Sequence, residues 1–260
     1  MSRKTKKSEQ KINPAVFLAS LLIFAAGVGI FSYPAVSNLL AERQQRNTVH
    51  VYEQNVSALE QEEIQEQREL AETYNANLVG DELHDPFIQG SGYVIPDNYN
   101  EVLNLSEDGV MGYVDIPKID VSIPIYHGTS EEILQKGAGH LEASSLPVGG
   151  TDTHSVISAH RGLPSAKLFT DLDELETGDV FYIHVLDEIL AYQVDQINTV
   201  DPDDLDLLRV VNGRDLVTLL TCTPYAVNTH RLLVRGTRIP YEEAKEVQEK
   251  AETGGNTISV

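Results

Sequence analysis

The chain has 260 residues, of which 41% are hydrophobic, and a formal net charge of −21. This length accommodates a membrane segment together with one domain of ordinary size. So acidic a surface argues against nucleic acid as a partner, because phosphates need Lys and Arg side chains. Residues 1–11 are the exception, with five basic residues and one acidic residue.

The N-terminal region predicts a membrane anchor. Residues 12–41 contain no charged side chain, and residues 15–33 are mostly apolar and long enough to cross a bilayer core as a helix. The basic tail, residues 1–11, places the N-terminus in the cytoplasm by the positive-inside rule and the rest outside the cell membrane, after a single pass. A cleaved signal peptide is the alternative, with Ala35 and Ser37 as small residues of a cleavage site. The length of the apolar stretch favours an uncleaved anchor.

Residues 42–79 predict one or two amphipathic helices. They contain no Gly or Pro, and apolar side chains recur at helical spacing at Tyr52, Val56 and Leu59 and again at Leu70 and Tyr74. These helices form either a solvated stalk or a layer packed on the main domain, and the apolar stripe favours packing. Residues 80–100 are dense in Gly, Pro, Asp and Asn, which is typical of a loop.

The main domain, residues 101–240, is mainly β. Runs rich in Val, Ile, Leu, Thr and Tyr are separated by turn residues and predict strands at 110–116, 121–126, 154–160, 180–186, 189–200, 216–222 and 231–239. Short helices are expected at 130–136 and near 203–210. Many strands with few long helices indicate a sandwich or a barrel. The tail, residues 241–260, is polar and begins as a helix.

Three polar residues stand at the ends of predicted strands: His160, Cys222 and Arg231. Cys222 is the single cysteine, so in an exported domain it is either buried and inert or kept because it reacts. An unperturbed thiol has a pKa of about 8.5, so a cysteine nucleophile needs a nearby cation, and His160 and Arg231 are available. The imidazole could also protonate a leaving amine, and the guanidinium could bind an oxyanion.

Each of these residues also has an ordinary interpretation. A cysteine at the end of an apolar strand is usually a small core residue. His160 is one of eight histidines, and Arg231 could be a surface charge on an edge strand. No metal site is indicated, since His154 and His160 share a strand face without a third ligand. Spacing alone therefore leaves open a non-enzymatic surface module with an inert cysteine.

Several motifs resemble the sortases, membrane-anchored cysteine transpeptidases of Gram-positive bacteria. Residues 218–222 read TLLTC, which is similar to the TLxTC signature of that family, with an Arg nine positions later and a His 62 positions earlier. Residues 125–150 and 154–171 (HSVISAHRGLPSAKLFTD) resemble class C, the pilus-assembling subgroup. Residues 85–87 (Asp-Pro-Phe) resemble the Asp-Pro-aromatic lid of that subgroup. The likeness covers the anchor and roughly residues 80–240.

The resemblance implies a closed eight-stranded β-barrel preceded by helices, and a transpeptidase without a cofactor. It makes Cys222 the nucleophile that attacks Thr in an LPxTG-like sorting signal, His160 the general acid and base, and Arg231 the residue that orients the substrate and stabilises the oxyanion. A lysine amine of a neighbouring pilin subunit would resolve the thioester as an isopeptide bond. A housekeeping sortase that uses a cell-wall precursor amine, or a hydrolytic relative, is the alternative.

The resemblance also assigns a lid, Asp85, Pro86 and Phe87, with Asp85 near Arg231 and Phe87 over Cys222. Its ordinary interpretation is a turn, since Asp-Pro is common in loops. One departure from the family pattern stands at the C-terminus, where many pilin-assembling sortases carry a second apolar segment and residues 241–260 are polar.

Overall fold

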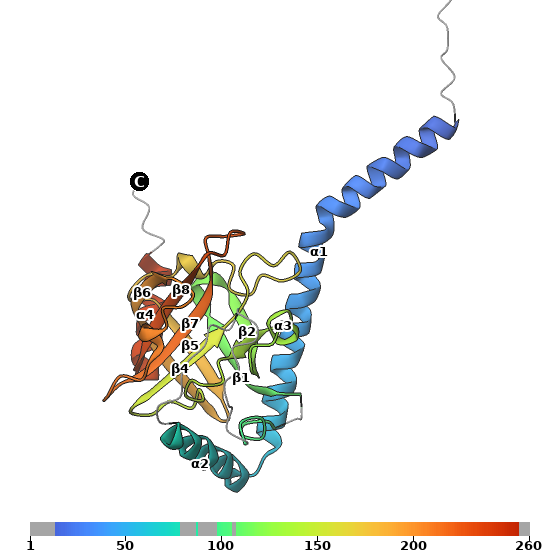
Figure 1. Ribbon diagram of the computed structural model, residues 1–260. Helices are drawn as coiled ribbons and strands as arrows, with labels where there is room; N and C mark the ends of the chain where they lie inside the picture. The colour runs from blue at the N-terminus through green and yellow to red at the C-terminus, as the bar shows by residue number, and fades with distance from the viewer. Residues whose placement is uncertain (1–13, 79–86, 88–97, 106–107, 255–260) are drawn as a thin grey trace, which may run out of the picture.

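The computed structural model describes residues 14–78, 87, 98–105 and 108–254. Within these residues the central feature is a closed β-barrel with the strand order β1-β2-β3-β4-β7-β8-β6-β5 (Figure 1). The strands are β1 (Val110–Ile116), β2 (Val121–His127), β3 (Ala138–His140), β4 (Thr153–Ser158), β5 (Val180–Val185), β6 (Glu188–Val200), β7 (Asp215–Thr223) and β8 (His230–Ile239). The predicted eight-stranded barrel is thus confirmed.

Two of the strand pairs are parallel, β2 with β3 and β4 with β7, and the other pairs are antiparallel. Side chains that alternate toward the inside fill the barrel, and each fully buried apolar side chain contributes about 1.5–3 kcal/mol. Fully buried examples are Ile125, Ile157, Ile183, Leu219 and Val234. Side chains therefore fill the interior of the barrel, so a functional site has to lie on the outer face of the barrel.

Two short helices lie at the predicted positions: α3 (Glu131–Leu134) and the 3-10 helix η3 (Asp206–Leu208). The C-terminal α4 (Tyr241–Gly254) agrees with the predicted helical start of the tail, whereas the 3-10 helices η1 (Pro117–Ile119) and η2 (Leu172–Glu174) were not predicted. Strand β3 was absent from the strand prediction, because its three residues include Gly139 and follow Gly137, and glycine disfavours strands. A Cβ on Gly139 would come within 2.3 Å of the Gly128 carbonyl oxygen, so this crossing of β3 and the β2–α3 loop requires glycine.

Helix α1 (Pro14–Ala58) is long and apolar enough to cross a membrane. An 18-residue stretch of it has a mean hydropathy of 2.3 and none of that stretch is buried. Figure 1 shows the N-terminal half of α1 projecting away from the barrel after a bend. Pro34 lies inside the helix and accounts for a bend, because proline removes one intrahelical hydrogen bond. These features indicate a membrane-anchored protein.

The second half of α1 packs on the barrel, which settles the choice between a stalk and a packed layer. Tyr52 and Val56 are buried against Tyr113 and Tyr126 of the barrel. The Tyr52 hydroxyl accepts a hydrogen bond from the Leu186 amide at 2.8 Å. Burial raises the pKa of Tyr52, so this hydroxyl stays neutral.

Helix α2 (Gln61–Asn77) is bound to two loops of the barrel by hydrogen bonds and ion pairs. The Asn75 amide side chain accepts from the Leu146 amide at 2.7 Å and donates to the Leu146 carbonyl at 3.1 Å. At the other end, Arg68 pairs with Asp187 and Glu188 of the β5–β6 hairpin at 3.0 and 2.9 Å. The C-terminal end of α2 is thus fixed to the barrel through Asn75.

Candidate active site

Cys222 lies on β7 between two strands that each bring one predicted site residue. On one side β8 runs antiparallel, and its register places Arg231 directly opposite Cys222. On the other side β4 runs parallel, and the Ala159 amide donates to the Leu220 carbonyl at 3.1 Å. Because each strand advances by one residue at a time, this register brings His160 beside Cys222. Three residues far apart in the sequence therefore form one row across three adjacent strands.

The Cys222 side chain points to the outer wall of the barrel. Neighbouring residues of a strand face opposite sides, and Leu219 belongs to the barrel core whereas Leu220 belongs to a separate cluster outside it. Cys222 shares the face of Leu220. Its side chain forms no disulfide, since the chain has no second cysteine, and it is only 6% exposed. The thiol is thus covered from outside and is not a filler of the barrel core.

Arg231 places a buried cation next to this thiol. The residue is 5% exposed, and its guanidinium Nη1 donates to the carbonyls of Asn228 and His230 at 3.2 and 3.1 Å. These bonds hold the guanidinium at the start of β8. Two unit charges about 4 Å apart interact by about 4 kcal/mol at an effective dielectric of about 20, so a guanidinium here can stabilise a thiolate or an oxyanion.

His160 lies two residues beyond Ser158, the last paired residue of β4, and is partly exposed. Its Nε2 atom is buried and has no hydrogen-bond partner among the residues that the structure describes. The nearest charged group is the Glu131 carboxylate of α3, with Oε1 at 3.6 Å from Nε2. The ring is therefore oriented by packing and by one acidic neighbour, and its nitrogens remain available for proton transfer.

Phe87 packs against both polar partners of the thiol. Its ring centroid is 5.8 Å from that of the His160 imidazole, and the Arg231 Cζ atom is 5.2 Å from the Phe87 centroid. Such contacts contribute about 0.5–1.5 kcal/mol for an aromatic pair and about 0.5–2 kcal/mol for a cation over a ring. Asp85 and Pro86 lie outside the described residues, so the position of Asp85 near Arg231 stays a prediction.

An apolar cluster continues from Phe87 along the outer wall of β4, β7 and β8. Beside Cys222 and Arg231, the side chains of Leu220 and Leu233 form its floor, and the connection between β6 and β7 covers one end. We call this cluster the apolar patch, and it consists of Leu141, Val156, Val200, Leu208, Leu220 and Leu233, with Phe87, Leu205 and Leu207 packed against it. The six core members are at most 8% exposed, so the apolar patch is a packed layer that holds the β6–β7 connection against the barrel wall next to the thiol.

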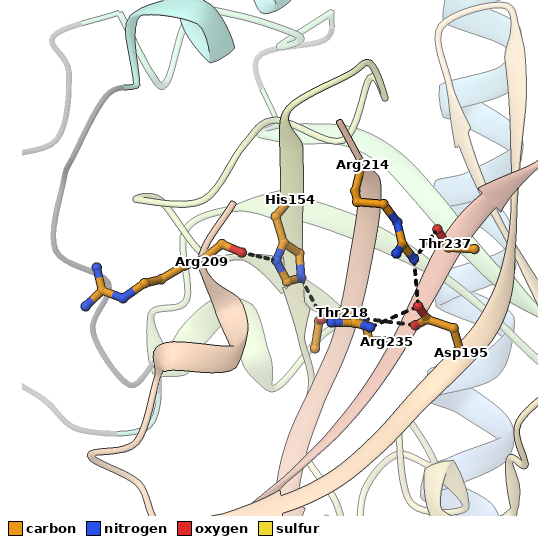
Figure 2. Close-up of polar contacts among 7 residues, drawn as sticks. All are labelled: His154, Asp195, Arg209, Arg214, Thr218, Arg235 and Thr237. Atoms are coloured by element: carbon orange, nitrogen blue, oxygen red, sulfur yellow. Dashed lines mark hydrogen bonds and ion pairs between the residues drawn. The ribbon is translucent and has the colours of Figure 1, made fainter. Parts of the chain in front are cut away.

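His154 anchors the loop that covers one end of the apolar patch (Figure 2). Its Nδ1 contacts the Arg209 carbonyl at 2.9 Å and its Nε2 contacts the Thr218 hydroxyl at 2.7 Å. A carbonyl only accepts, so Nδ1 carries the proton and Nε2 accepts from Thr218. Burial lowers the pKa of His154 to about 4, which keeps the ring neutral. The same view shows Asp195 held by Arg235 at 2.9 Å through both carboxylate oxygens.

The spacing of residues in the sequence does not reveal two features of this site. Glu131 was read only as part of a short helix, and its proximity to His160 depends on β3 lying next to β4. The apolar patch leaves a trace in the sequence, because Thr218, Leu220 and Cys222 occupy every second position of β7 and therefore share one face of the strand. That face can be recognised as buried only once the strand is known to be covered on its outer side.

Comparisons with known proteins agree with this arrangement. The sortase domain family matches residues 114–239. The crystal structure of sortase C from Streptococcus pneumoniae is similar at 52% sequence identity with a TM-score of 0.69, covering 75% of this chain and 97% of that one. Sortase C-1 of Actinomyces oris is similar at 49% identity with a TM-score of 0.64, covering 68% of this chain and 99% of that one.

A more distant relative is sortase A of Bacillus anthracis, which is 22% identical over 224 residues, 84% of this chain and 92% of that protein. Sortases are cysteine transpeptidases, and the chain has a single cysteine, which is buried and lies opposite Arg231 in the pairing of β7 with β8. The identity to sortase C structures is about twice the identity to this sortase A. The chain therefore belongs to the sortase family, and within it to the class C sortases.

Proposed function

We propose that the chain polymerises pilin subunits. Cys222 attacks the Thr carbonyl carbon of an LPxTG-like sorting signal, the peptide bond after Thr breaks, and a thioester forms. A lysine amine of a second pilin subunit attacks the thioester, an isopeptide bond forms, and the Cys222 thiol is regenerated. His160 protonates the leaving amine in the first step and takes a proton from the incoming amine in the second. Arg231 orients the signal and stabilises the oxyanion.

The observation that supports this chemistry most is the row of His160, Cys222 and Arg231 across β4, β7 and β8. The pilin substrate rests on the likeness to class C enzymes: pilin substrate specificity is attributed to the sortase C of Streptococcus pneumoniae, and the sortase C of group B Streptococcus is pilus-related.

We also propose that Asp85, Pro86 and Phe87 form a lid over the resting site. The contacts of Phe87 with His160 and Arg231 support this role, because an aromatic ring there restricts access to the thiol between them. Asp85 would then pair with Arg231. The lid explains how a single reactive cysteine can be kept from oxidants outside the cell.

The membrane arrangement follows from the charge pattern. The basic residues 1–11 precede the apolar half of α1, so we propose a single pass with the N-terminus in the cytoplasm and the catalytic domain outside. Substrates that are themselves held at the outer face of the membrane would meet this domain there.

The decisive experiment combines a trapped intermediate with a choice of acceptor. The protein is incubated with a sorting-signal peptide, and mass spectrometry is expected to find a thioester on Cys222 in the parent and none in Cys222→Ala. With the peptide thioester formed, a pilin carrying the acceptor lysine is compared with a cell-wall precursor amine. A peptide–pilin conjugate joined by an isopeptide bond is expected with the parent and none with Cys222→Ala, whereas transfer only to the precursor would indicate the housekeeping role.

A further inference from the structure

Glu131 extends the row of site residues on the side away from Arg231. It opens α3, which leads into β3, and β3 pairs with β4. The order across the wall is therefore carboxylate, imidazole, thiol and guanidinium, contributed by Glu131, His160, Cys222 and Arg231. The acidic and the basic group stand on opposite sides of the thiol.

The carboxylate is held in place but remains open to solvent. Gln135, one helical turn later, donates from Nε2 to Glu131 Oε1 at 2.9 Å. The Glu131 side chain is 55% exposed, and its distance of 3.6 Å from His160 Nε2 is too long for a hydrogen bond. An exposed pair of this kind is weak, so the carboxylate keeps most of its capacity for another cation.

The nearby cations are occupied elsewhere. Arg161, next to His160 in the sequence, pairs with Asp173 and donates to Thr223. Lys136, two residues after the end of α3, has its Nζ atom over the Tyr126 ring at 4.6 Å from the ring centroid. Neither contact involves the Glu131 carboxylate, so a negative group faces the solvent on the His160 side of the thiol.

We propose that Glu131 is the binding group for the acceptor lysine ammonium, an inference that rests on the proposed function. A lysine side chain has a pKa of about 10.4 and arrives as an ammonium. Glu131 binds it beside His160, which removes one proton. The nitrogen then attacks the thioester carbonyl carbon, the C–N bond forms and the C–S bond breaks. Of the two protons that the nitrogen loses, one returns to the Cys222 sulfur and one leaves to solvent.

The arrangement separates the two substrates by charge. The oxyanion that develops in each step needs the guanidinium of Arg231, and a carboxylate on that side would oppose it. An ammonium needs the opposite environment and finds it 3.6 Å from the imidazole that must accept its proton. Glu131 therefore determines which kind of nucleophile reaches the thioester.

The test is a competition between a cationic and a neutral nucleophile. The full chain, in Glu131→Gln and in the matched control Glu132→Gln, is given a sorting-signal peptide with either a lysine peptide or hydroxylamine at varied concentration. The two positions are adjacent, exposed and on the same short helix. In Glu131→Gln the ratio of lysine transfer to hydroxylamine transfer is expected to fall about threefold to fivefold through a higher KM for the lysine peptide, with its kcat little changed; in Glu132→Gln the ratio should be that of the parent.

A fall of both transfers by the same factor would overturn the proposal, because Glu131 would then act only by orienting His160. An unchanged ratio with unchanged rates would also overturn it. Glu131→Asp, which keeps the charge, should recover part of the lysine preference. If the parent chain forms no thioester or transfers to no lysine, the proposed function fails, which is distinct from a parent that transfers to lysine and a Glu131→Gln variant that does so equally well.

Discussion

Replacing Phe87 by Ala should expose the thiol. Phe87 contacts the His160 ring at 5.8 Å between centroids and the Arg231 guanidinium at 5.2 Å, and these contacts contribute about 0.5–1.5 and about 0.5–2 kcal/mol. Losing both removes about 1–3.5 kcal/mol from the covered state, so the population of the open state rises about 5- to 300-fold. The rate at which a thiol reagent modifies the protein should rise by the same factor.

The measurement is unusually direct because Cys222 is the only cysteine of the chain. Every modified molecule therefore reports this thiol, and a colorimetric reagent gives its rate constant. Phe87→Leu keeps apolar volume without the ring and should lie between the parent and Phe87→Ala. Tyr241→Ala, which alters an aromatic side chain on α4, should react at the parent rate. Equal rates for Phe87→Ala and the parent would refute the idea that Phe87 covers Cys222.

Two further predictions concern stability. Tyr99→Phe should lower the free energy of unfolding by about 1–3 kcal/mol, because the buried hydroxyl contacts His140 Nδ1 at 2.9 Å and accepts from the Gly128 amide at 2.9 Å; urea unfolding checks this, and the exposed Tyr225→Phe should be neutral. Burial lowers the pKa of His154 to about 4, below about 6.5 for an unfolded histidine, so the unfolded state takes the proton first. The stability from this group is complete above about pH 6.5 and is lost toward pH 4, by up to about 1.4 kcal/mol per pH unit. His154→Asn should flatten that slope, and an equal slope would contradict the assignment.

Much of the barrel is readable from the sequence because its strands are strongly patterned. The runs at 110–116 and 121–126 coincide with β1 and β2 almost to the residue. The run at 154–160 was read as strand to His160, whereas β4 ends at Ser158 and His160 lies just beyond it. The closure of the barrel came from the resemblance, since two parallel pairings join strands that no local signal connects.

The residues of the candidate site also fall into those that the sequence predicts and those that it does not. Strand ends pointed to His160, Cys222 and Arg231, and their meeting depends on the register of β4 with β7 and of β7 with β8. Glu131 could not be found by spacing, because its neighbourhood with His160 follows from a three-residue strand that carries little hydrophobic signal. The hydrophobic pattern of the sequence thus identifies site residues at the ends of long strands. Which short connecting segments lie next to those residues depends on how the strands pair in the fold.

A row of three residues on adjacent strands has little freedom of its own. The backbone pairing of β4 with β7 and of β7 with β8 fixes the positions of Cys222 and Arg231 and of the strand end that leads to His160. Phe87 packs on both His160 and Arg231 from outside the barrel wall. If the proposed lid role of Phe87 holds, the barrel supplies the geometry of the site and the contacts of Phe87 control access to it.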